Sequence, residues 1–301
     1  MDEDDEERLR RWAANGSLEQ SQVVVSYEGR QHLSLIREDI CSLLPRRWVT
    51  NNIVQWMCST FNDSKSLRFK DDFYYILPGI WNLDSFKEAP TVSYVGLGPH
   101  FGDDSRFFEK IEASMRKWWF ARVCIDRHWW LYAFEISKKR LWVLDSMYTG
   151  EPNNKRLKIH AYAGRIIEDM AKVSIPAYEH TENGLPHFYP SVPKQHNGCD
   201  CGVFVIKFMQ FWRIDKPLQH WDKEFRKEII LDIVIGPHNS EIGKALQALD
   251  SDHVHRNQPR KKTKAVRSLF TARARRACCS VQGYLLESQT RGEDNRRRLF
   301  E

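Results

Sequence analysis

The stretch from Lys194 to Phe208, KQHNGCDCGVFVIKF, places two cysteines one residue apart, directly before a long apolar run. Gly198 allows a tight turn and Asp200 is a residue type that caps helices, so Cys201 would lie in the first turn of a helix. A helix N-terminus favours the thiolate, which is the nucleophilic form of cysteine. A buried thiol that only packs explains the same residues, and this stretch alone favours that interpretation.

A nucleophilic thiol needs a base, and the base needs an orienting group. His128 opens the run HWWLYAFEI, and Asp145 closes the run RLWVLDS, 17 residues later. Both therefore lie toward the open end of a predicted hairpin. A simple hairpin centred on Ser137–Arg140 places His128 opposite position 149, so contact with Asp145 requires a register shift or a bulge. Taken singly, His128 also fits a packing residue and Asp145 a turn residue.

Acyl transfer also requires donors for the developing oxyanion. Gln195, six residues before Cys201, can offer its side-chain amide, although a polar loop Gln is common. A zinc site built from His187, His196, Cys199 and Cys201 is disfavoured, because the spacing lacks the usual C-x2-4-C pairs. A disulfide between the two cysteines is disfavoured by the geometry that such a bond needs.

The surrounding pattern predicts alternating helices and strands. Helical periodicity or apolar runs predict helices at 34–45, 48–61, 106–119, 157–173, 201–212 and 223–236. Extended runs predict strands at 23–27, 120–126, 128–136 and 140–146, a strand or extended arm at 71–81, and loops at 82–104 and 179–195. The 201–212 run is apolar nearly all round, which indicates a buried helix.

The charge is divided unevenly along the chain. The net charge is +6, yet residues 252–301 hold 13 Lys/Arg and 5 Asp/Glu, which leaves a net −2 for the remainder. The basic tail predicts nuclear targeting or nucleic-acid contact, or a solvated disordered segment. We expect the acidic segment 1–22 to be mostly disordered, with a short helix near Glu6–Ala14.

Targeting signals and cysteine usage favour an intracellular protein. The opening residues lack the basic and apolar regions of a secretory signal, and no apolar run reaches the length of a membrane span. Seven cysteines at irregular spacing favour a reducing compartment with free thiols.

Together these residues carry a family resemblance. His128-Trp129, Asp145-Ser146 and the run from Gln195 to Gly202 resemble the motifs H-W, D-S and Q-x-N-G-x-D-C-G of the ubiquitin-like-protein-specific (SUMO) cysteine protease family. The resemblance covers roughly residues 23–237. It implies an α+β papain-like fold, with a central mixed sheet flanked by helices and the catalytic Cys at the N-terminus of a buried helix.

The resemblance also implies a role for two tryptophans. Trp48-Val49-Thr50-Asn51 corresponds to the family's W-L-N-D motif. Trp48 and Trp129 match the positions that line a narrow tunnel for the substrate's Gly-Gly tail, where flat aromatic walls admit only glycine. Two core tryptophans are the alternative. Asn51 replaces an acidic residue, and Cys199 stands where the family often has an aromatic one.

The resulting hypothesis is a peptidase that cleaves after the Gly-Gly of a SUMO-like modifier, using Cys201, His128, Asp145 and Gln195. We expect a protease domain at 23–237 and a disordered basic tail at 238–301. No metal or cofactor is expected. The expected partners are the SUMO-like modifier and its conjugates, and nucleic acid at the basic tail. We expect a monomer in the nucleus that does not associate with membranes. A non-catalytic binding module and a mobile-element-derived protease with another substrate are the alternatives.

Overall fold

The computed structural model describes residues 3–29, 32–76, 109–148, 150–215, 218 and 224–247. The principal helices are α1 (Glu3–Ala13), α2 (Arg37–Cys41), α3 (Asn51–Asn62), α5 (Lys110–Ser114), α6 (Asn154–Ser174), α7 (Cys201–Phe211) and α8 (Phe225–Val234), with a π-helical turn η1 (Arg68–Asp72). The strands are β1 (Val23–Glu28), β2 (His32–Ile36), β3 (Phe73–Ile76), β4 (Trp118–Ile125), β5 (His128–Glu135), β6 (Arg140–Leu144) and β7 (His187–Phe188).

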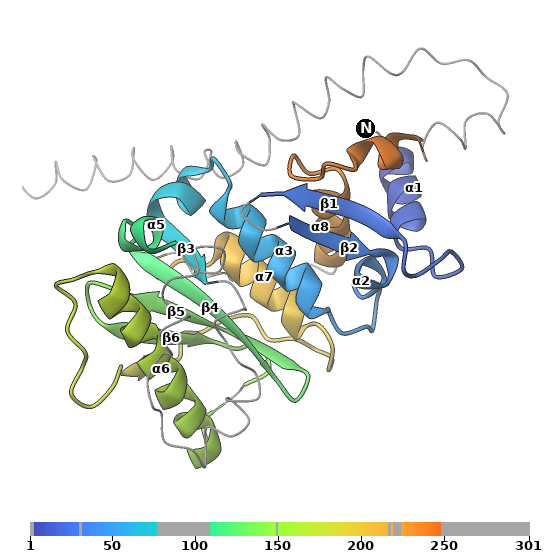
Figure 1. Cartoon of the computed structure of the whole chain (residues 1–301). Coiled ribbons are helices and arrows are strands. Elements are labelled where there is room, and N and C mark those ends of the chain that lie inside the picture. Colours follow the sequence, from blue (N-terminus) through green and yellow to red (C-terminus); the bar gives the residue numbers. More distant parts are fainter. Residues whose placement is uncertain are drawn as a thin grey trace, which may run out of the picture.

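A five-stranded mixed sheet forms the centre of the fold, in the order β3-β4-β5-β6-β7 (Figure 1). The outer pairs β3-β4 and β6-β7 are parallel, whereas β4-β5 and β5-β6 are antiparallel. β1 and β2 pair separately. The predicted α+β architecture, a mixed sheet flanked by helices, is confirmed.

Both faces of this sheet are buried, which explains the uninterrupted apolar runs in its strands. Successive side chains of β5 point to opposite faces. Trp129, Leu131 and Ala133 join a cluster with α3 and α7. Trp130, Tyr132 and Phe134 join a cluster with α6 on the other face. The sheet is therefore the middle layer between α6 and the α3-α7 pair.

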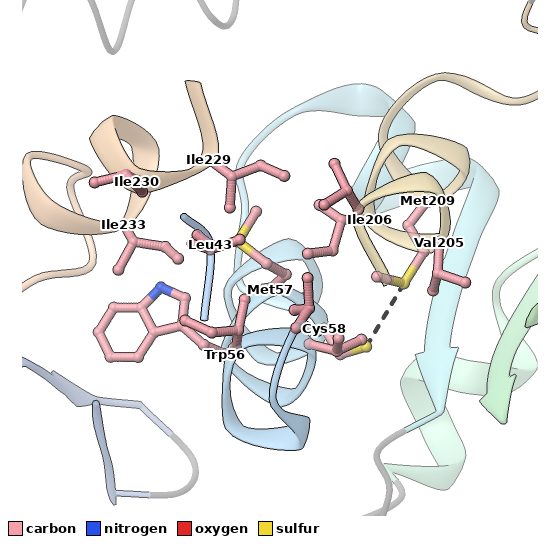
Figure 2. Close-up of a cluster of buried hydrophobic side chains, with 14 of the residues drawn as sticks. Leu43, Trp56, Met57, Cys58, Val205, Ile206, Met209, Ile229, Ile230 and Ile233 are labelled. Atoms are coloured by element: carbon pink, nitrogen blue, oxygen red, sulfur yellow. Dashed lines mark hydrogen bonds between the residues drawn. The ribbon is translucent and has the colours of Figure 1, made fainter. Parts of the chain in front are cut away.

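Helix α7 is buried nearly all round because α3 and α8 pack on the sides that the sheet leaves open (Figure 2). Cys58 of α3 lies beside α7, with its Sγ 3.6 Å from Sδ of Met209. Ile206 of α7 and Ile229 of α8 are fully buried in the same cluster. Each such side chain contributes roughly 1.5–3 kcal/mol of burial free energy, so the helix that begins at Cys201 is firmly anchored.

The predicted disorder of residues 1–22 was wrong over most of that segment. Leu9 and Ala13 of α1 are fully buried. The buried guanidinium of Arg37 donates to the carbonyl of Trp12 and, at 3.2 Å, to that of Ala13. The acidic composition misled because the charges of α1 occupy one side of the helix, while its apolar side packs on the fold.

The predicted boundary at residue 237 also falls too early. Asn239 accepts the backbone N–H of Ser26 at 3.3 Å and donates to the carbonyl of Val234 at 2.7 Å. Ala245 is fully buried. Residues 248–301, which hold the predicted disordered tail, lie outside the described residues, as do the predicted loop at 82–104 and positions 77–81.

Two predicted helices are shorter than the periodicity indicated. In the described part of 106–119, residues 109–119, the helix is α5 alone, and Trp118 already opens β4. The aromatic side chains from Trp118 onward pack against the sheet, which overrides the helical spacing. Within 34–45 the first residues complete β2, and only α2 is helical. No helix among the described residues is long and apolar enough to cross a membrane.

Candidate active site

His128 is the first residue of β5 and follows a tight turn. Asp126 and Arg127 have φ of 52° and 65°, both in the left-handed region. Positive φ at both central residues is what a two-residue type I′ hairpin turn requires. This turn joins β4 to β5, where Ile125 pairs with His128, and places the imidazole at the end of the sheet.

The register of β5 and β6 brings His128 and Asp145 to one face. Leu131 lies opposite Leu144, so the same register extended along the strands puts His128 opposite position 147. Asp145 is then the diagonal neighbour of His128 on that face. The register shift that the sequence required is present without a bulge, because the turn begins at Ile136, one residue earlier than predicted.

The His128 imidazole and the Asp145 carboxylate form a direct ion pair. Nε2 of His128 lies 2.9 Å from Oδ1 and 3.0 Å from Oδ2 of Asp145. The carboxylate is 3% exposed, and it also accepts the backbone N–H groups of Met147 and Tyr148. These donors fix the carboxylate, and the carboxylate in turn fixes the plane and tautomer of the imidazole.

A second cation, which the sequence did not single out, binds the same carboxylate. Arg156, in the first turn of α6, donates from Nη2 to Oδ2 of Asp145. Its Nε donates to His160 at 3.3 Å, and its guanidinium lies 4.5 Å from the ring centroid of Trp130. Asp145 is therefore shared between an imidazole and a guanidinium.

This environment moves two pKa values in opposite directions. Burial lowers the pKa of His128, but the hydrogen bond to Asp145 and the interaction with Cys201 outweigh it and raise the pKa to about 9. Burial raises the pKa of Asp145, but the hydrogen bond from His128 and the charge of Arg156 outweigh it and lower the pKa to about 2. Both shifts favour a charged imidazolium-carboxylate pair at neutral pH.

Cys201 lies at the N-terminus of α7 and interacts with the His128 imidazole. Its side chain is fully buried, and Sγ lies 3.7 Å from the carbonyl oxygen of Arg127. Nδ1 of His128 has no hydrogen-bond partner within the described residues, while Nε2 is committed to Asp145. The ring therefore has one nitrogen for Asp145 and the other available to the sulfur of Cys201.

The loop before Cys201 is built on Asn197. Oδ1 of Asn197 accepts the backbone N–H groups of Cys199 and Asp200 at 2.9 and 3.0 Å, and Sγ of Cys199 lies 3.2 Å from it. Asp200 occupies the N-cap position of α7, but its side chain makes no capping hydrogen bond. Its carboxylate instead accepts from Asn197 and from Arg226 of α8. Asp200 therefore stands at the predicted N-cap position, but its side chain does not cap the helix.

Gln195 is tethered at both ends of its side chain. Oε1 accepts the hydroxyl of Ser146 at 2.6 Å, and the backbone N–H of Gln195 donates to the Ser146 carbonyl at 3.0 Å. Because Oε1 is fixed in this way, the amide nitrogen faces the loop before Cys201, where it donates to the carbonyl of Asn197. Ser146, which directly follows Asp145 in the chain, thus links Gln195 to Asp145.

The two predicted tunnel tryptophans differ in environment. Trp48 is 46% exposed and donates from its indole N–H to the carbonyl of Gly198 at 3.0 Å. Trp129 is buried in the core and donates to the carbonyl of Val49 at 3.3 Å. A Cβ at Gly202 would lie 2.7 Å from Cβ of Val49 and 3.2 Å from the Trp129 ring. Glycine therefore lets the start of α7 approach both segments closely.

Asn51, the departure from the family's acidic residue, has a defined partner. Its Oδ1 accepts from Nη1 of Arg122 at 2.8 Å. Arg122 is buried and lies 5.0 Å from the ring centroid of Trp129. Asn51 is exposed, so this position carries a neutral amide where an aspartate would present a negative charge.

Metal coordination has no support in the described part of the chain, which contains no group of three or more His, Cys, Asp or Glu side chains suited to a metal ion. The five cysteines that the structure describes are free thiols. The site is thus a thiol, an imidazole and a carboxylate in sequence, on a mixed sheet and a buried helix. This combination defines the class of papain-like cysteine proteases.

The comparison with known proteins finds similarity to one family within that class. Residues 115–233 match the model of the Ulp1 protease family, C-terminal catalytic domain. This part of the chain is therefore similar to that catalytic domain, and the resemblance drawn from the motifs is confirmed.

The similar proteins include both characterised sequences and solved structures. Human sentrin-specific protease 2 is 31% identical over 115 residues, 36% of this chain and 18% of that protein. The putative ubiquitin-like-specific protease 1B of Arabidopsis thaliana is 27% identical over 209 residues, 67% of this chain and 57% of that protein. The chain thus spans less than two thirds of either relative.

A solved structure supports the fold over a greater length. The C-terminal Ulp1 protease domain, in complex with Smt3, the yeast ortholog of SUMO, superimposes with a TM-score of 0.55 at 18% identity. The match covers 78% of this chain and 96% of that one. At this level of identity the likeness concerns the fold.

Proposed function

We propose that this chain is a cysteine peptidase that hydrolyses the bond after the C-terminal Gly-Gly of a SUMO-like modifier. The observation that carries the proposal is that His128 interacts with both Asp145 and Cys201, with Nε2 bound to the carboxylate and Nδ1 without a hydrogen-bond partner among the described residues. The likeness to proteases named as sentrin-specific and ubiquitin-like-specific supports the choice of modifier class.

In the first half of the reaction, the Cys201 thiolate attacks the carbonyl carbon of the terminal glycine, while His128 holds the proton as imidazolium. The tetrahedral oxyanion accepts from the Cys201 backbone N–H and from the Gln195 amide, which exchanges its bond to Asn197 for the oxyanion. His128 then protonates the leaving amine, the C–N bond breaks, and a thioester remains on Cys201.

In the second half, neutral His128 removes a proton from water, and the resulting hydroxide attacks the thioester. The C–S bond breaks, the modifier leaves with a free glycine carboxylate, and the proton on His128 restores the thiolate-imidazolium pair. Asp145 stays ionised throughout, since its pKa lies at about 2, and stabilises the imidazolium.

The same proposal assigns the selection of glycine to Trp48 and Trp129. Trp48 is held beside the loop before Cys201 by its bond to Gly198, and Trp129 borders Gly202 at the start of α7. Two aromatic faces leave room for a chain without side chains, so a Gly-Gly tail passes and bulkier residues do not.

A panel of modifier probes tests this proposal. SUMO-like, ubiquitin and other modifiers that end in a Gly-Gly vinyl sulfone are incubated with the wild type, Cys201→Ser and Cys199→Ser. We expect a covalent adduct with a SUMO-like probe for the wild type and Cys199→Ser, and none for Cys201→Ser. Tight binding of a modifier without any adduct would instead show a non-catalytic binding module, and an adduct with a different modifier alone would redirect the substrate.

We further propose nuclear enrichment through the basic tail. The segment from Arg256 to Arg276 carries nine basic residues and no acidic one. Such islands suit nuclear targeting or nucleic-acid contact. Deletion of 252–301 from a fluorescent fusion should spread the protein through the cell, and unchanged localisation would count against the proposal.

A further inference from the structure

Arg226 of α8 is a buried cation whose hydrogen bonds all reach the surroundings of the candidate site. The residue is 7% exposed. Its Nε donates to Oδ1 of Asp200 at 2.8 Å, and Nη2 lies 2.6 Å from the same oxygen. Asp200 directly precedes Cys201, so one charge-assisted contact of Arg226 is adjacent to the proposed nucleophile.

The remaining donors of Arg226 bind backbone carbonyls of two segments. Nη1 donates to the carbonyls of Ser42 and Leu44 at 3.2 and 3.0 Å. Nη2 donates to the carbonyls of Arg47 and Cys199 at 2.8 and 3.1 Å. All five N–H groups of the guanidinium are therefore used, and a planar fork of this kind cannot shift without breaking several bonds at once.

These contacts join the two sides of the proposed substrate passage. Residues 42–47 lead directly into Trp48, whereas Cys199 and Asp200 lead directly into Cys201. A direct hydrogen bond, from the Trp48 indole to the Gly198 carbonyl, also joins the two sides. Arg226 thus fixes the distance between the segment that leads into Trp48 and the loop that leads into Cys201.

We propose that Arg226 is a positioning residue for the peptidase reaction: it clamps the Trp48 segment to the Cys199–Cys201 loop and so holds the thiol in line with a substrate tail in the passage. This inference rests on the proposed function, because it assigns Cys201 as the nucleophile. Its position inside the charged run KEFRKE makes Arg226 look like a surface residue in the sequence.

The chain offers a matched control at the other end of α7. Arg68 is 6% exposed and donates to the carbonyls of Met209 and Trp212. Arg226→Gln and Arg68→Gln make the same chemical change to a buried arginine that binds carbonyls. They differ in whether those carbonyls lie beside Cys201 or beside the C-terminus of the helix.

The experiment measures kcat and KM for a SUMO-like modifier with a fluorogenic amide after Gly-Gly, below the melting temperature of every variant. Alkylation of Cys201 by chloroacetamide, followed by mass spectrometry, reports the thiol without requiring the passage. For Arg226→Gln we expect kcat to fall about 100-fold, since a displacement of about 1 Å has that effect, with alkylation within about threefold of wild type.

We expect Arg68→Gln and Arg226→Gln to lower the melting temperature by comparable amounts. The kcat of Arg68→Gln should nevertheless stay within about threefold of wild type. Arg226→Lys should recover about tenfold of the lost kcat, because an ammonium keeps the bond to Asp200 but cannot span the carbonyls. Equal kcat for the two Gln variants, or an equal fall in alkylation and kcat, would overturn the inference. If the wild type fails to turn over any modifier substrate, the proposed function fails first and the inference with it.

Discussion

Two histidines on the α6 side of the sheet, the partly buried His128 and the fully buried His160, have opposite electrostatic environments. His128 and His160 both pack against Trp130, with ring centroids 5.8 and 6.4 Å from its ring. His128 contacts the Asp145 carboxylate, whereas His160 accepts from Arg156. The pKa of His160 is lowered to about 3, by burial first and by the charge of Arg156 second, whereas the pKa of His128 is raised to about 9.

This contrast shows how the nearest charge combines with burial: contact with a carboxylate outweighs burial at His128, whereas the guanidinium adds to the effect of burial at His160. Arg156 Nε can only donate, so Nε2 of His160 is an acceptor, and Nδ1 of the neutral ring faces the Tyr132 hydroxyl at 2.6 Å. His160 stays neutral and helps to hold Arg156. His128 favours the protonated form because its Nε2 contacts the Asp145 carboxylate, which also accepts from Arg156.

Replacing His128 tests the contrast with the largest expected effect. His128→Gln should lower turnover of a Gly-Gly substrate by about 1,000-fold or more, because the thiol loses its proton acceptor. His160→Gln is the control, since it removes a fully buried imidazole that accepts from Arg156. Comparable losses of turnover in both variants would show that the loss of a packed imidazole, and not of the contact with the Asp145 carboxylate, lowers turnover.

Neutralising Asp145 should have the next largest effect. In Asp145→Asn the pKa of His128 falls from about 9 toward its ordinary value, so the imidazolium is lost at lower pH. We expect kcat to drop about 100-fold and the alkaline limb of the pH-rate profile to move to lower pH. Asp169→Asn breaks the exposed pair with His180 and is the control, which should leave the profile unchanged. An unmoved alkaline limb in Asp145→Asn would contradict the assignment.

Removing Arg156 should affect both histidines by a smaller amount. Arg156→Met leaves Asp145 with His128 and its backbone donors, and we expect about a tenfold loss of kcat through looser positioning of the carboxylate. It should also raise the pKa of His160, since the repelling charge is gone. Titration of the two imidazoles by NMR measures this directly. A His160 pKa that stays near 3 in the variant would assign the shift to burial alone.

The smallest effect concerns stability and has opposite signs at the two histidines. The folded pKa of His160 lies below the unfolded value, so its neutral form favours folding above about pH 6.5, and this contribution is lost as the pH falls toward 3. The folded pKa of His128 lies above the unfolded value, so its contribution is full below about pH 6.5 and is lost as the pH rises through 9.

Urea unfolding across pH 4–10 checks these signs. His160→Gln should flatten the acid side of the stability profile, and His128→Gln should flatten the alkaline side. Turnover of His160→Gln at pH 7 should remain within about threefold of wild type. Flattening on the same side in both variants would show that the two environments do not differ in sign.

The sequence predicted most of the elements that carry the site, because their patterns are local. The three runs of β4, β5 and β6, the buried helix α7 and the register shift follow from apolar spacing and turn length. By contrast, Arg156 and Arg226 are single charged residues in charged helical runs, and nothing local marks them as buried. Their partners, Asp145 and Asp200, come from distant segments, so their roles appear only when the fold brings the segments together.

The errors in the predicted elements have a related cause. The acidic composition of residues 1–22 indicated disorder, but Leu9 and Ala13 find a tertiary surface that the segment does not encode by itself. The helical spacing near Trp118 gave way to pairing of β4 with β5. Asn153 accepts the backbone N–H of Arg156 and starts α6, a capping signal that could have placed Arg156 in the first turn.

The most direct test of the central claim is the cleavage of a SUMO-like precursor that carries a C-terminal extension after Gly-Gly. Intact mass spectrometry of the products is compared for the wild type, Cys201→Ser and Cys199→Ser. The account predicts one product that ends at the second glycine, formed by the wild type and Cys199→Ser and absent with Cys201→Ser. Cleavage by Cys201→Ser would contradict it. So would a precursor that stays intact after long incubation with the wild type, if the wild type also forms no adduct with any modifier probe.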